Sequence, residues 1–131
     1  MTLLLSCQSK VTPLDQESPS LYFKAAEQAR FQRKHKRAIH LYKRIQLRFA
    51  DNFPIILEAE FSIAQIYFSW PGHDKEAGKH YRNVVAFYRR PEIGNDIFPQ
   101  SYLHLAQKNL ETIASRQKFR FFPQKTRGVK S

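Results

Sequence analysis

The side chains of this chain that could do chemistry are its histidines and its single cysteine. His73 falls in a predicted turn and His80 about two helical turns later, without the i, i+4 pairing or the His-Glu-x-x-His motif that brings metal ligands together. His35 and His40 lie among lysines and arginines and are poor ligands for a cation. Cys7 has no base placed beside it by the sequence, so it is not a candidate nucleophile. We therefore expect His73 and His80 at the surface, no cofactor, no metal site and no enzyme activity.

Composition limits the fold and the class of partner. The 131 residues suffice for one domain with a modest core, and four scattered glycines cannot form a phosphate-binding loop. The 22 lysines and arginines, against 11 acidic residues, leave a net charge of +11. Such a surface attracts polyanions, which include nucleic acid, anionic lipid and acidic proteins. Charge alone does not choose among them.

Apolar residues recur at helical spacing along most of the chain, and no segment has the pattern of a strand. The fold class is therefore predicted to be all-α. Asp51, Asn52 and Pro54 separate the second helix from the third, and Asp74 is the candidate N-cap of the fourth. The pattern predicts helices at residues 21–31, starting from Ser18, and then at 38–49, 54–69, 74–88 and about 98–118, the last with Tyr102, Leu105, Ala106 and Leu110 as its apolar stripe.

Two pairs of these helices share one pattern of alanines and tyrosines, and the last helix begins the same pattern again. Small side chains let two helices approach closely, and aromatic rings fill the space beside them. We predict that the alanines are buried contact points with the tyrosines packed around them. The repeated positions are Ala26, Ala38, Ala64, Ala77 and Ala106, with Tyr22, Tyr42, Tyr67, Tyr81 and Tyr102.

This pattern resembles the tetratricopeptide repeat, with Pro54 and Pro91 closing the two units. The repeated alanines lie 38 and 42 residues apart, against the usual 34. Longer units are similar to those of bacterial outer-membrane assembly lipoproteins and cell-envelope coordinators, and "EAEFSIAQIYFSWPGHDKEAGKHYRNVVAFYRRP" carries most of that resemblance. The resemblance implies antiparallel helix hairpins stacked as a short right-handed solenoid over residues 19–118. Residues 1–18 would be an N-terminal tether and residues 119–131 a basic tail.

In repeats of this kind, the first helix of each pair lines a concave face that holds a peptide or protein segment. The resemblance places ten residues on that face: Phe23, Glu27, Arg30, Phe31, Glu58, Phe61, Gln65, Phe68, Leu103 and Gln107. Four phenylalanines there are more than the hairpin contacts need, so one interpretation is apolar anchors for a partner. The other is that the chain's own "FRFFP" segment, with Phe119, Phe121 and Phe122, folds back and covers them.

A run without acidic residues extends from Arg30 to Arg48. Four of its members avoid the apolar stripe of the second helix and are predicted to form an outward basic face: Arg37, Lys43, Arg44 and Arg48. Three interpretations stay open for this face. It is a solvated surface, it lies against anionic lipid headgroups, or it binds nucleic acid as part of a basic helical module.

The N-terminal "MTLLLSCQS" resembles a bacterial lipobox, in which the cysteine is lipidated. The apolar segment before Cys7 is shorter than a signal peptide requires, so the alternative is an untethered apolar tip. A lipidated Cys7 together with a basic patch would anchor the protein at the bacterial cell envelope, on the periplasmic face of a membrane. Without lipidation we expect a cytoplasmic protein. The favoured function is a non-catalytic scaffold for a protein segment, and the alternative is a module that binds nucleic acid or another polyanion.

Overall fold

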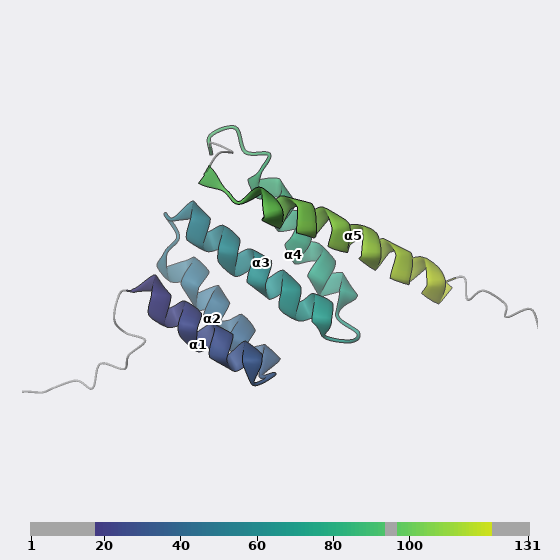
Figure 1. Cartoon of the computed structure of the whole chain (residues 1–131), viewed down its shortest axis with the longest axis horizontal. Coiled ribbons are helices and arrows are strands. Elements are labelled where there is room, and N and C mark those ends of the chain that lie inside the picture. Colours follow the sequence, from purple (N-terminus) through teal and green to yellow (C-terminus); the bar gives the residue numbers. More distant parts are fainter. Residues whose placement is uncertain (1–17, 94–96, 122–131) are drawn as a thin grey trace, which may run out of the picture.

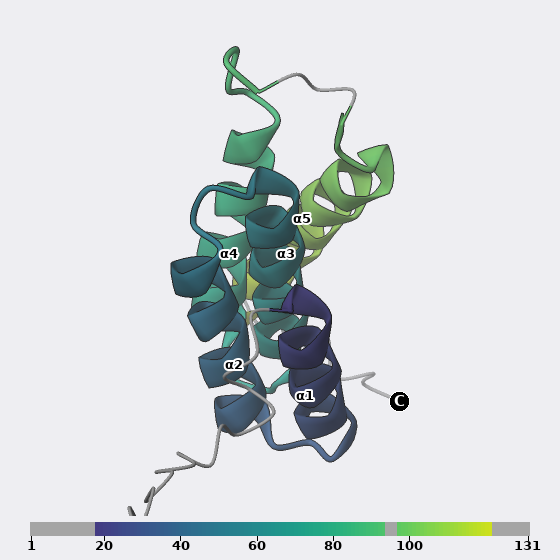
Figure 2. The same cartoon turned by 90° about the vertical axis from the view of Figure 1, so that its left-hand side faces the viewer.

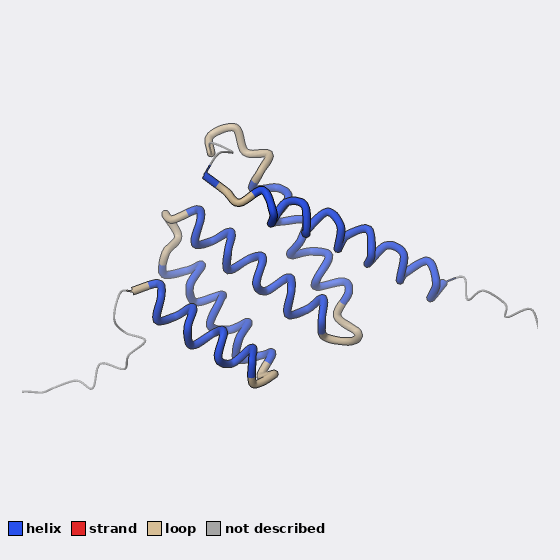
Figure 3. Tube along the Cα trace, viewed as in Figure 1, coloured by secondary structure: helices blue, strands red, loops and turns tan. Residues whose placement is uncertain are grey.

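The computed structural model describes residues 18–93 and 97–121, and those residues form five helices without a strand (Figure 3). This confirms the all-α prediction. The predictions for Cys7, for the tether at residues 1–17 and for Phe122 and the residues after it lie outside the described residues. No described helix has the length and apolarity needed to cross a bilayer. The helices are α1 Pro19–Phe31, α2 His35–Arg48, α3 Phe53–Ser69, α4 Asp74–Phe87 and α5 Gln100–Phe121.

Local turn chemistry fixes the helix ends, and the start of α2 and the N-cap of α4 are among those that differ from the prediction. Arg33 has a φ of 57° and Lys34 donates its backbone N–H to Ala29 at 2.9 Å, so the chain reverses within three residues. α2 therefore begins at His35 rather than at residue 38. Asn52 does separate α2 from α3, because its side chain accepts the N–H of Ile55 at 3.3 Å. Asp74 is not an N-cap, since it is already the first residue of α4.

The helices are arranged in two layers. α1 with α2 and α3 with α4 form antiparallel hairpins, and each helix packs mainly against its neighbours in sequence. Figures 1 and 2 show α1, α3 and α5 on one side of the molecule and α2 and α4 on the other. α3 also contacts α5 directly. The first helix of each pair and the unpaired fifth helix therefore share one layer.

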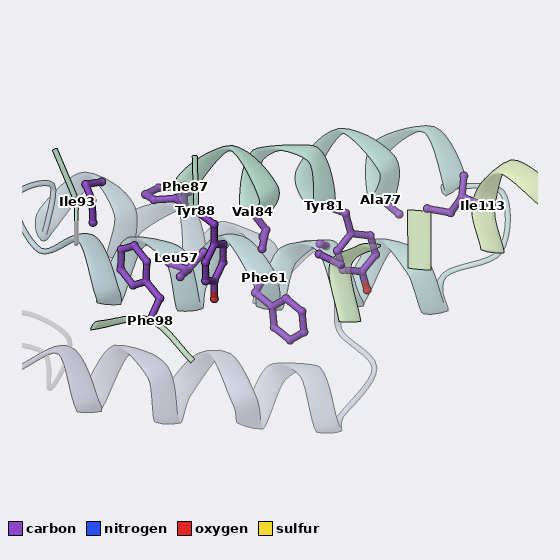
Figure 4. Packing of buried hydrophobic residues seen from close by; sticks show 12 residues of the cluster. Leu57, Phe61, Ala77, Tyr81, Val84, Phe87, Tyr88, Ile93, Phe98 and Ile113 are labelled. Atoms are coloured by element: carbon purple, nitrogen blue, oxygen red, sulfur yellow. The ribbon is translucent and has the colours of Figure 1, made fainter. Parts of the chain in front are cut away.

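The alanine positions of the repeat are the contact points between helices, as predicted. Each of the five has no exposed surface: Ala26, Ala38, Ala64, Ala77 and Ala106. Tyr22, Tyr42 and Tyr81 are also fully buried, whereas Tyr67 and Tyr102 are half-buried. Figure 4 shows Tyr81 beside Phe61 in the cluster between α3 and α4. Close approach at alanine and filling by aromatic rings thus build two core clusters, one among α1, α2 and α3 and the other among α3, α4 and α5.

α5 differs from its prediction in length and in one apolar position. It continues to Phe121, so the first residues of the predicted tail are helical. Leu105, expected in the buried stripe, is 38% exposed. Phe119 and Phe121 are 63% and 80% exposed, so the interpretation that they fold back over the first helices is wrong. The helix carries them into solvent instead.

Candidate functional site

The surface that the resemblance points to lies on the layer of α1, α3 and α5, and we call it the first-helix face. Its members at the described surface are Phe23, Glu27 and Arg30 of α1, Glu58 and Gln65 of α3, and Leu103 and Gln107 of α5. All seven are partly or largely exposed. Phe31 of α1 and Phe68 of α3 are also at least partly exposed, so the structure leaves nine of the ten predicted residues accessible to solvent on one layer.

Polar contacts join α1 and α3 across this face. The Arg30 guanidinium donates to the Gln65 side-chain oxygen at 3.0 Å and lies 3.5 Å from a Glu27 carboxylate oxygen. The Tyr42 hydroxyl from α2 donates to the same Glu27 oxygen. Phe23 packs against the edge of the Tyr42 ring, with the ring centroids 6.0 Å apart. Tyr42, which is buried, thus supports both a polar and an apolar member of the face from below.

Burial and negative charge raise several pKa values along this face. Desolvation, followed by the hydrogen bond to Glu27 and the charge of that carboxylate, raises the pKa of Tyr42 well above its usual value. Desolvation and then the charge of Glu27 raise the pKa of Glu58. Desolvation and then the charge of Glu58 raise the pKa of Tyr102. The charge of Glu27 on α1 thus acts on Glu58 of α3, and the charge of Glu58 acts on Tyr102 of α5, although the chain as a whole is basic.

The three other predicted phenylalanine anchors have different environments, and one of them is buried. Phe61 is only 5% exposed because Tyr102 of α5 stacks on it, with the ring centroids 4.4 Å apart. Phe68 is half-buried, and the Arg116 guanidinium lies 4.5 Å from its ring centroid. Phe31 is 90% exposed at the end of α1. Phe61 is therefore a core residue, and the prediction that it is an open anchor is wrong. Helix α5 covers it, which the repeat pattern of α3 alone could not reveal.

The predicted basic face is exposed, but it is not one surface. Arg44 and Arg48 lie over the Tyr22 ring, at 5.9 and 5.8 Å from its centroid. Lys43 lines a different pocket with residues of α3 and α4, and Arg37 lines two others. The predicted face is therefore divided: Arg37, Arg44 and Arg48 share the side of α2 toward α1, and Lys43 alone lies toward α3 and α4.

Helix α3 holds a buried carboxylate that the sequence pattern did not reveal. Glu60 is 6% exposed and accepts hydrogen bonds from His80 at 2.7 Å, Asn83 at 2.7 Å and Gln46 at 2.6 Å. His80, expected at the surface, has a side chain only 14% exposed. The available signal was Glu60 itself, an acidic residue inside the apolar run of α3, since such a residue needs partners from neighbouring helices.

Two further observations bear on what this site can do. Among the described residues, no group of three or more histidine, cysteine, aspartate or glutamate side chains is placed to hold a metal ion. No family of proteins, no curated protein and no solved structure gives a significant match to this chain. Any function assigned to the chain therefore has to come from the geometry of the helices and their exposed side chains.

Proposed function

We propose that this protein is a non-catalytic scaffold of the tetratricopeptide type, a short solenoid that binds a protein or peptide segment on its first-helix face. The observation that carries the proposal is the shared layer of α1, α3 and α5, on which partly exposed side chains from successive first helices meet. A segment lying across this layer reaches all three helices. Stacked helical pairs offer such extended surfaces without a deep pocket.

The charges of the first-helix face indicate which segment suits it. Glu27 and Glu58 are close enough for the charge of one to raise the pKa of the other. A lysine or arginine of a partner would relieve this repulsion and pair with both carboxylates. Half-buried Phe23 and Leu103 supply apolar contact on either side. We therefore expect a partner segment with a basic residue flanked by apolar ones.

Site-specific photo-crosslinking tests this proposal. A benzophenone amino acid is introduced at Glu58 or Gln107, which are exposed on α3 and α5, and in matched controls at Lys79 or Arg82, which are exposed on α4. We expect a discrete cross-linked protein from the first two positions and none from the control positions. A peptide from that protein, centred on the cross-linked site, should then bind the purified chain.

The binding of that peptide has its own matched controls. Glu58→Lys should weaken it by about tenfold or more, because it replaces an attraction with a repulsion. Glu76→Lys, which makes the same charge change at an exposed position of α4 in the other layer, should leave it within about twofold. Equal cross-linking from both layers, or cross-linking from α4 alone, would contradict the assignment of the face.

Attachment to a membrane is a separate part of the proposal. Lipidation at Cys7 and contact of α2 cations with anionic headgroups would place the scaffold at the bacterial cell envelope. Arg37, Lys43 and Arg44 are exposed, which is compatible with such contact. The division of these cations between two sides of α2 reduces the number that one flat surface can reach at once.

A further inference from the structure

A second candidate site lies away from the first-helix face, where α2 meets the turn between α3 and α4. A pocket of about 350 Å³ opens there, and we call it the Trp70 pocket. Its volume is within the range of small-ligand sites. None of its lining comes from α1 or α5. The lining residues are Lys36, Ile39, His40, Lys43, Tyr67, Trp70, His73 and Glu76.

Flat rings form one wall of the Trp70 pocket. Trp70 stacks with His73, with the ring centroids 3.9 Å apart and the planes 24° apart. Tyr67 lies parallel to Trp70 within 6° and stacks with His73 at 5.8 Å. His35 stacks with Trp70 from α2 at 4.9 Å. The planes of these rings lie within 29° of Trp70 and the rings stack mainly on one another, which suits a planar ligand that extends the stack or lies against the ring edges.

Two lysines and a histidine of α2 also line the pocket. Lys36, His40 and Lys43 recur at i, i+4 and i+7 along α2 and are all exposed. Glu76 is the one carboxylate of the lining. A neighbouring pocket of about 380 Å³ shares Lys36 and Trp70 and has no acidic residue in its lining. Its other lining residues are Arg33, Lys34, His35 and Arg37. Aromatic planes therefore lie beside two adjoining spaces that favour negative charge.

We propose that the Trp70 pocket binds a nucleotide unit, with the base stacked on the aromatic wall and the phosphate held by Lys36 and Lys43. Neither element alone selects this ligand, because lysines bind any anion and rings stack on any planar group. Their combination in one pocket selects a planar base that carries a phosphate. Free mononucleotides and single-stranded nucleic acid share this chemistry. In a strand, the neighbouring pocket would take the next phosphate.

The fluorescence of Trp70 tests this inference directly, because it is the only tryptophan of the chain. The full-length protein is titrated with adenosine monophosphate, a short single-stranded oligothymidylate, adenosine and inorganic pyrophosphate. We expect saturable quenching by the mononucleotide or the oligonucleotide, at least about fivefold tighter than by adenosine or pyrophosphate. Tighter binding of the oligonucleotide than of the mononucleotide indicates a strand as the ligand, and the reverse order indicates a free nucleotide.

Charge-neutral variants separate the pocket from general attraction to a basic protein. Lys36→Gln/Lys43→Gln should weaken the binding of the mononucleotide or the oligonucleotide, whichever binds more tightly, by about tenfold. The matched control Lys108→Gln/Lys118→Gln removes the same charge from exposed positions of α5 and should change its affinity by less than about twofold. All four lysines are exposed, so the variants should keep their helical circular dichroism.

Three outcomes would overturn the inference. In the first, neither nucleotide ligand quenches the Trp70 fluorescence to saturation. In the second, pyrophosphate binds as tightly as the nucleotide. In the third, the two double variants lose the same amount of affinity for the nucleotide ligand. None of these outcomes bears on the first-helix face, because no residue that lines the Trp70 pocket belongs to that face. The two proposals therefore fail or survive separately.

Discussion

Replacing Tyr81 with alanine is expected to lower the free energy of unfolding by about 3–5 kcal/mol. Tyr81 is fully buried, and the rings of Phe61 and Phe68 pack against its ring at centroid distances of 6.1 and 5.9 Å. Figure 4 shows it in the cluster that joins α3 and α4. Removing the ring leaves a cavity that these helices cannot close, because their spacing is set by Ala64 and Ala77. Urea denaturation followed by circular dichroism measures the loss.

Tyr81→Phe is the matched control for this prediction. It keeps the ring and removes only the hydroxyl, which accepts a hydrogen bond from Asn109 of α5 at 2.8 Å. We expect this variant to lose about 1 kcal/mol. If phenylalanine destabilised the protein as much as alanine does, the hydrogen bond to α5 and not the packed ring would account for the loss, which would contradict the role of the ring in the core.

Replacing Glu60 with glutamine is expected to cost about 2–3 kcal/mol at neutral pH. Three side chains from α2 and α4 donate hydrogen bonds to this buried carboxylate, and an amide cannot accept all of them without meeting a donor with its own N–H groups. Urea denaturation measures the difference. Glu111→Gln, the same change at an exposed position of α5, should stay within about 0.5 kcal/mol of wild type.

Wild type and Glu60→Gln should also differ in how their free energy of unfolding depends on pH, and the sign of this difference can be predicted. Burial raises the pKa of Glu60, but the hydrogen bonds from His80, Asn83 and Gln46 outweigh it and leave a pKa below the usual 4.5. A lowered folded pKa contributes stability above the unfolded value, and that stability is lost as the pH falls through the folded value. The difference in the free energy of unfolding between wild type and Glu60→Gln should therefore become smaller below pH 4.5. If this difference in the free energy of unfolding stayed constant on acidification, Glu60 would not be the ionised centre of this network.

The helices and their contact points could be predicted from the sequence because they depend on local spacing. Alanines and tyrosines repeat within each hairpin, so the burial of Ala38 and Ala77 follows from their positions in the repeat. The start of α2 could not be predicted in the same way. A non-glycine residue with positive φ, Arg33, ends α1, and it allows polar His35 to begin the next helix.

The parts of the candidate sites that could not be predicted depend on contacts between distant segments. The spacing within α3 predicts that Phe61 is an exposed anchor, because the ring that covers it belongs to Tyr102 of another helix, 41 residues later. The spacing within α4 predicts that His80 is exposed, because its partner Glu60 belongs to another helix, α3. Trp70 belongs to a turn in the sequence, and only the packing of α2 beside that turn gives it a pocket. A periodic pattern gives the face of a helix but not the side chain that covers it.

The central claim is that α1, α3 and α5 share one layer that presents the first-helix face. Nuclear Overhauser spectroscopy on selectively labelled protein tests it most directly. We predict cross-peaks between the rings of Phe61 and Tyr102, whose centroids are 4.4 Å apart, and between the side chains of Arg30 and Gln65, joined by a 3.0 Å hydrogen bond. Cross-peaks that connect Tyr102 to α2, with none to Phe61, would contradict the layer and the binding face built on it.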